Sequence, residues 1–131
     1  MTSCIIHRVT RRILIAEDDA DIRGLFRHAL VLAGFDVQEA GDGLAAVQLI
    51  DDSPPDLVVL DLGLPYLSGH AVRLKITSQP HTRNIPIIVV TGRAEHRDVS
   101  VSSVLQKPVT PDRLVEEVRK CFAAAETSKA S

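Results

Sequence analysis

Short aliphatic runs alternate along the chain with stretches in which apolar residues recur at helical spacing. The aliphatic runs predict five strands, at residues 13–16, 36–40, 57–60, 86–91 and 104–106. The helical stretches predict helices at 21–33, from 42 to the Pro54-Pro55 pair, at 70–78 and from 111 to about 125. Strands that alternate with helices imply a parallel sheet with right-handed crossovers and helices on both faces. The fold class is therefore α/β.

Residues with known preferences for helix ends support these boundaries. Gly34 follows the first helix, where a left-handed residue is common. Asp42 can cap the second helix, and either Asp19 or Asp21 can act as a cap or turn residue before the first. Thr110 is the expected cap of the last helix, with a proline in its first turn.

Length and composition fit one soluble domain. The chain has 131 residues, of which 45% are apolar and 24% charged. We expect a domain at 12–125, an N-terminal extension at 1–11 and a flexible tail at 126–131. The net charge of −2 argues against nucleic-acid binding, and no apolar run approaches the ~18 residues of a membrane span. Cys4 and Cys121 form no disulfide framework, so we expect free thiols and a cytoplasmic location.

Chemically active side chains stand where the predicted strands end. Glu17 and Asp18 follow the first strand, and Asp61 follows the third. Thr91 ends the fourth strand, and Lys107 follows the fifth. Ligands of an open parallel sheet bind beyond the carboxyl ends of its strands, so these five residues are expected at one edge.

The chemistry of this set suits phosphoryl transfer. Three nearby carboxylates repel one another, and a hard divalent cation such as Mg²⁺ relieves that repulsion. Thr91 offers a hydroxyl donor, Lys107 a compact positive charge, and Gly92 leaves room for an incoming group. Asp61 among a cation, a hydroxyl and an ammonium is a candidate nucleophile for phosphorus. Each residue alone has an ordinary structural explanation, as a cap, a strand former or a solvated lysine, so the prediction depends on their coincidence.

These motifs together resemble the receiver domain of two-component response regulators. The resemblance extends over about residues 12 to 124 and is carried by 13–19, 55–65, Gly69, 86–92 and Lys107-Pro108. It implies a doubly wound, flavodoxin-like sheet of five parallel strands in the order 2-1-3-4-5. It also implies a cis bond between Lys107 and Pro108.

The resemblance implies a role for each site residue. Asp61 would accept a phosphoryl group from the phosphohistidine of a sensor histidine kinase or phosphotransfer protein. Asp18 would bind Mg²⁺ (or Mn²⁺) directly, Glu17 would bind it through water, and Gly63 would contribute its backbone carbonyl.

The phosphoryl oxygens and the output of the domain complete the implied mechanism. Thr91 and Lys107 would hold the phosphoryl oxygens. The domain would then catalyse its own phosphorylation and dephosphorylation instead of acting as an enzyme on other substrates. A downstream protein target would read the phosphorylated form.

The sequence departs from typical receivers in two places. Val104 occupies the position of an aromatic residue that rotates on activation, and Val109 replaces the usual aromatic after Lys107-Pro108. Fifteen residues separate Thr91 from Lys107, several fewer than usual. We therefore expect the helix between the fourth and fifth strands to be shortened or absent, although a short helix with tight loops stays possible. In typical receivers this helix forms the dimer face together with the fifth strand and the last helix. Because the helix is expected to be reduced here, we expect a monomer or weak dimer.

Two other functions stay open. The chain could be a degenerate receiver that serves as an unphosphorylated protein-binding module, or a phosphohydrolase acting on external substrates. No general acid or substrate pocket for the latter is evident. The five histidines show no metal-ligand spacing and are expected at the surface.

Overall fold

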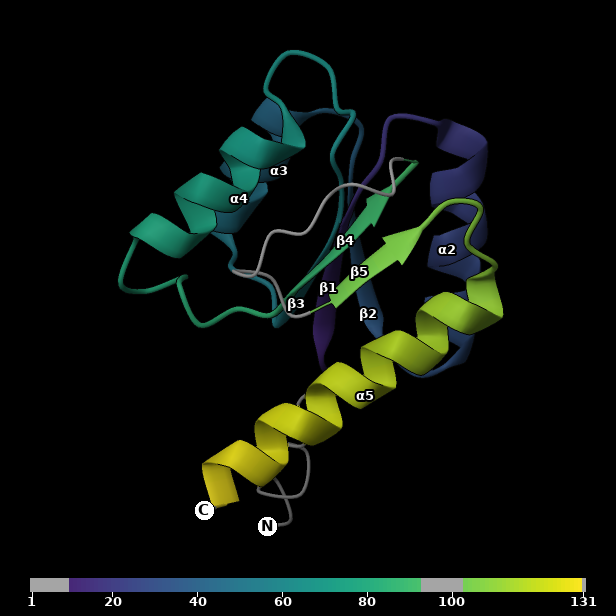
Figure 1. Ribbon diagram of the computed structural model, residues 1–131, viewed down its shortest axis with the longest axis vertical. Coiled ribbons are helices and arrows are strands. Elements are labelled where there is room, and N and C mark those ends of the chain that lie inside the picture. The colour runs from purple at the N-terminus through teal and green to yellow at the C-terminus, as the bar shows by residue number, and fades with distance from the viewer. Residues whose placement is uncertain (1–9, 93–102, 131) are drawn as a thin grey trace, which may run out of the picture.

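The computed structural model describes residues 10–92 and 103–130, with side chains described as far as Ala125. Five parallel strands form one sheet in the order β2-β1-β3-β4-β5, which confirms the predicted topology (Figure 1). The elements are β1 (Arg12–Ala16), α2 (Ala20–Leu32), β2 (Asp36–Ala40), α3 (Gly43–Asp52), β3 (Leu57–Asp61), α4 (Gly69–Ser78), β4 (Ile87–Thr91), β5 (Ser103–Gln106) and α5 (Pro111–Ala130).

Helices cover both faces of the sheet (Figure 1). Helices α2 and α5 pack on one face, and α3 and α4 pack on the other. Alternate residues of β1 point to opposite sides: Ile13 and Ile15 join the core under α2 and α5, whereas Leu14 and Ala16 join the core under α3 and α4. Strands β3 and β4 are buried along their whole length, which explains their continuous aliphatic sequence.

The caps lie where the sequence predicts them. The Asp19 carboxylate caps α2 by accepting bonds from the Asp21 and Ile22 amides, and Asp42 caps α3. Gly34 has a positive φ of 98° after α2. The Thr110 hydroxyl accepts a bond from the backbone of Arg113, so it caps α5.

Some boundaries differ from those expected. Strand β4 begins at Ile87, one residue later than predicted, because Pro86 has no N–H to donate to the ladder. Helix α5 continues to Ala130, past the end predicted at Ala125. Strand β5 begins at Ser103, so the connection from β4 is residues 92–102, eleven in all. The predicted shortening of the helix in this connection falls on 93–102, outside the described residues.

Within the part of the chain that the structure describes, every helix is too short or too polar to cross a membrane.

Candidate functional site

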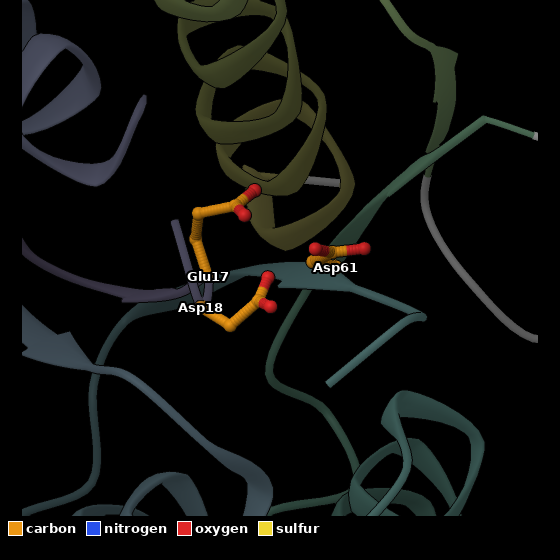
Figure 2. A group of neighbouring side chains, drawn as sticks. All are labelled: Glu17, Asp18 and Asp61. Carbon is orange, nitrogen blue, oxygen red and sulfur yellow. The ribbon is translucent and has the colours of Figure 1, made fainter. Parts of the chain in front are cut away.

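Three carboxylates meet at the carboxyl edge of the sheet (Figure 2). Strand β1 ends at Ala16, so Glu17 and Asp18 leave the sheet together, and neighbouring β3 ends on Asp61 itself. Each acid places one oxygen within 4.8 Å of the others. Glu17 and Asp61 are buried, whereas Asp18 is exposed. The sequence prediction that these three acids lie together is confirmed as geometry.

Two hydrogen bonds hold the buried Glu17, one through its backbone amide and one through its carboxylate. Its amide donates to the Ala40 carbonyl at 3.0 Å, which continues the pairing of β1 with β2 by one residue. Its carboxylate accepts the Asp19 amide at 3.1 Å. Burial raises the pKa of Glu17 to about 7; the bond from Asp19 opposes this rise, and the charge of Asp61 adds to it.

Lys107 lies between the acids that β1 and β3 present. Its Nζ donates to Asp61 Oδ2 at 3.2 Å and lies 3.6 Å from Glu17 Oε1. Burial by itself would lower the pKa of Lys107, but the carboxylates of Asp61 and Glu17 raise it above its ordinary value. One ammonium thus faces two buried acids.

The end of β5 is joined to the end of β4 beside this lysine. The Lys107 amide donates to the Thr91 carbonyl at 2.7 Å, which places Thr91 next to Lys107 across the ladder. Thr91 is buried. The Lys107–Pro108 bond is cis, as predicted.

The loop after β3 folds back over the acceptor candidate. The Gly63 amide donates to Asp61 Oδ1 at 2.9 Å, so both carboxylate oxygens of Asp61 have donors. Gly69 begins α4 against the backbone of Asp61; a β-carbon there would lie 2.5 Å from the Asp61 carbonyl oxygen. A side chain at position 69 would therefore displace this backbone.

An open cleft of about 600 Å³ connects these residues, and its lining includes Asp18, Asp61, Gly63, Thr91, Gly92 and Lys107. His70 also lines the cleft, although nothing in the histidine spacing predicts it. Its position directly after Gly69 could have suggested it, because Gly69 packs on the backbone of Asp61.

The donor set fits a hard divalent cation. Asp18 and Asp61 line an open cleft that leaves space for water, and the buried Glu17 places an oxygen within 4.8 Å of theirs. Carboxylate oxygens with room for water are what Mg²⁺ accepts in proteins. Among the described residues, those that line the cleft include no cysteine. Their carboxylate oxygens favour Mg²⁺ or Mn²⁺ over softer metals.

Comparisons with known proteins agree with this site. The family model for the response regulator receiver domain matches residues 13–119. The phosphate regulon transcriptional regulatory protein PhoB of Escherichia coli is 33% identical over 117 residues, which are 85% of this chain and 51% of PhoB. This chain therefore spans about half the length of that curated relative.

Two solved structures share the fold at low identity. The receiver domain of a signal transduction histidine kinase from Syntrophus aciditrophicus has a TM-score of 0.80 and 26% identity, covering 88% of this chain and 92% of that one. The receiver domain of a sensor histidine kinase from Pseudomonas aeruginosa PAO1 has a TM-score of 0.77 and 25% identity, covering 86% and 97%. That structure holds a magnesium ion coordinated in its active-site cleft.

The chain belongs to the response regulator receiver domain family of two-component signalling. Members of this family are phosphoacceptors and not conventional enzymes. The receiver fold predicted from the sequence is thus confirmed.

Proposed function

We propose that Asp61 accepts a phosphoryl group from the phosphohistidine of a sensor histidine kinase or phosphotransfer protein, within a phosphoacceptor domain at 12–125. One observation supports this most directly. The Asp61 carboxylate lies in an open cleft with Lys107 bonded to it at 3.2 Å and two further acids beside it. A nucleophile, a cation and a prospective metal site are thereby within reach of one incoming group.

In the proposed reaction, an Asp61 oxygen attacks phosphorus while the bond from phosphorus to the histidine nitrogen breaks. The electron pair of that bond returns to the imidazole, and an acyl phosphate forms on Asp61. Lys107 and Thr91 hold phosphoryl oxygens, so negative charge on the transferred group is met by an ammonium and a hydroxyl. Lys107 already bonds the Asp61 carboxylate, so its ammonium lies beside the oxygen that would carry the phosphoryl group.

The proposed metal ligands are the carboxylates of Asp18 and Asp61, Glu17 through water, and the Gly63 carbonyl. When bound, Mg²⁺ (or Mn²⁺) supplies positive charge that offsets repulsion between the acids and the phosphoryl group. Glu17 and Asp18 directly follow β1, Asp61 ends β3 and Gly63 lies in the loop after it, so the ligands come from the ends of two neighbouring strands.

The proposed setting is a cytoplasmic receiver that acts as a monomer or weak dimer and passes its signal to a protein target. Val104 cannot serve as an aromatic switch, so the phosphorylated state must be reported by another movement. Ordering of a loop is a recognised form of such a switch.

Mass spectrometry of the intact chain tests the acceptor. We expect one added phosphoryl group after incubation with acetyl phosphate and Mg²⁺, and none in Asp61→Asn. Asp56→Asn is a matched control, because Asp56 lies before the opposite end of β3 and accepts the Arg12 amide at 2.7 Å. It should leave the adduct intact.

Other outcomes would point to the alternatives. An absent adduct in the wild type would contradict the proposal and support a degenerate receiver that acts as a protein-binding module. Multiple turnover of a phosphate monoester would instead indicate a phosphohydrolase.

A further inference from the structure

Arg23, on α2, contacts the chain at the point where it leaves β1. Its Nη1 donates to the backbone carbonyl of Glu17 at 2.7 Å. Its Nε donates to Glu39 Oε1 at 3.2 Å, at the neighbouring strand β2. The side chain is 21% exposed, so these bonds are partly shielded from solvent.

These bonds fix the main chain on both sides of Asp18. The guanidinium holds the carbonyl before Asp18, and the backbone amide of Arg23 donates to the Asp19 carbonyl after it at 2.9 Å. The Glu17 amide also donates a hydrogen bond to the Ala40 carbonyl. The peptide unit between Glu17 and Asp18 therefore has a defined orientation.

Asp18 depends on that orientation more than the other two acids do. Glu17 and Asp61 are buried, so packing limits where their carboxylates can point, whereas Asp18 is exposed. Apart from its hydrogen bond with the Glu17 carboxylate, the direction of its short side chain follows from the main chain that carries it. A change in the Glu17–Asp18 peptide would turn the carboxylate away from Asp61.

Glu39 holds Arg23 in turn, and it also pairs with a second arginine. Its other oxygen, Oε2, lies 3.2 Å from Nε of Arg27, which is one helical turn further along α2. Arg23 and Arg27 therefore share one carboxylate, but among the residues that the structure describes only Arg23 also bonds the Glu17 carbonyl. The pair allows the bond to Glu17 to be tested apart from the ion pair with Glu39.

We infer that Arg23 is a positioning residue for the metal site: it holds the Glu17 carbonyl so that the Asp18 carboxylate is aimed at the cleft. This inference rests on the proposed binding of Mg²⁺ by that cleft. Partners that orient metal ligands commonly change metal affinity by about 10- to 100-fold when they are removed.

Isothermal titration calorimetry of the full chain with MgCl₂ tests the inference. We expect Arg23→Ala to weaken Mg²⁺ binding by about tenfold or more. Arg27→Ala should stay within about twofold of the wild type, because it removes only an exposed ion pair. Arg23→Lys should recover part of the affinity, because an ammonium can still donate to the Glu17 carbonyl.

Circular dichroism in EDTA is to be recorded for each variant at the temperature of the titration, so that a loss of affinity is separated from a loss of structure. Equal Mg²⁺ affinity in the wild type and Arg23→Ala would overturn the positioning role. A lysine variant as weak as the alanine variant would also overturn it, because the donor to the carbonyl would then not matter. A wild type that binds no Mg²⁺ would refute the proposed metal site itself. That outcome is distinct from a loss of binding in the variants alone.

Discussion

The Nζ atom of Lys107 lies 3.2 Å from Asp61 Oδ2 and at the same time 3.6 Å from Glu17 Oε1. One ammonium, directly after β5, therefore forms ion pairs with two acids, one at the end of β3 and one directly after β1. A divalent cation in the same cleft would compete with this ammonium for the same oxygens.

We predict that Lys107→Met tightens Mg²⁺ binding. Removal of a positive charge about 4 Å from the acids changes their interaction with a cation by about 1 to 4 kcal/mol, so binding tighter by about fivefold or more is expected. The measurement is the rise in unfolding temperature on addition of MgCl₂, which should be larger than in the wild type. Lys75→Met, which removes an ion pair with Asp51 on α3, is the control. An unchanged Mg²⁺ response in Lys107→Met would contradict the prediction.

The metal-free protein should lose stability as the pH rises toward neutrality. The pKa of Glu17 in the folded protein is about 7, above its ordinary value of 4.5, so between these pH values the folded state keeps a proton that the unfolded chain has released. The free energy of unfolding contributed by Glu17 therefore falls from pH 4.5 to pH 7 and then levels off.

Urea unfolding in EDTA across this pH range measures the effect. Glu17→Gln should remove this contribution, so the difference in stability between the two proteins should change with pH. The groups that face Glu17, namely Asp61, Asp18 and Lys107, are present in both. A difference that is constant with pH would show that Glu17 does not titrate in this range.

Gly69→Ala should destabilise the protein and disturb Asp61. The new β-carbon would lie 2.5 Å from the Asp61 carbonyl oxygen and 2.6 Å from Leu62 Cα, both of them backbone atoms that cannot simply rotate away. We expect a cost on the order of 1–3 kcal/mol in urea unfolding. Gly24→Ala on α2 is the matched control, because its β-carbon meets nothing within 4 Å. It should gain up to ~1 kcal/mol through helix propensity.

Val104 should accept a large aromatic side chain. It is 39% exposed on β5, so Val104→Tyr should change the free energy of unfolding by no more than about 0.5 kcal/mol. Leu105, its neighbour on the strand, is 6% exposed, and Leu105→Ala should cost about 2–5 kcal/mol. Equal losses in the two variants would mean that Val104 is more constrained than its exposure indicates.

The strands and the acid cluster could be predicted because one physical rule governs each. Continuous aliphatic runs such as β3 form strands covered on both faces, and parallel strands bring their carboxyl ends to one edge. Once Asp61 and Glu17 are placed at the ends of neighbouring strands, their proximity needs no further information. Caps such as Asp42 were predictable for a similar reason, because the bond is local in sequence.

Contacts that depend on side-chain reach could not be predicted in this way. Arg23 shows only as a polar residue on a helix, and its bond to the Glu17 carbonyl requires the docking of α2 against β1 and β2. His70, the second residue of α4, reaches the cleft because the loop after β3 brings the start of α4 back to Asp61, and no periodic pattern describes the path of that loop. The end of α5 was missed because its last turns lack an apolar stripe that would mark them.

The cleft takes its parts from β1, β3, β4 and β5, and Lys107 comes last along the chain. A ribosome that has released the chain only as far as β4 has made all three acids but not their counter-charge. Such an intermediate would hold mutually repelling carboxylates that a free divalent ion could occupy without competition. Synthesis through Lys107 then adds the positive charge that competes with a cation for the same oxygens.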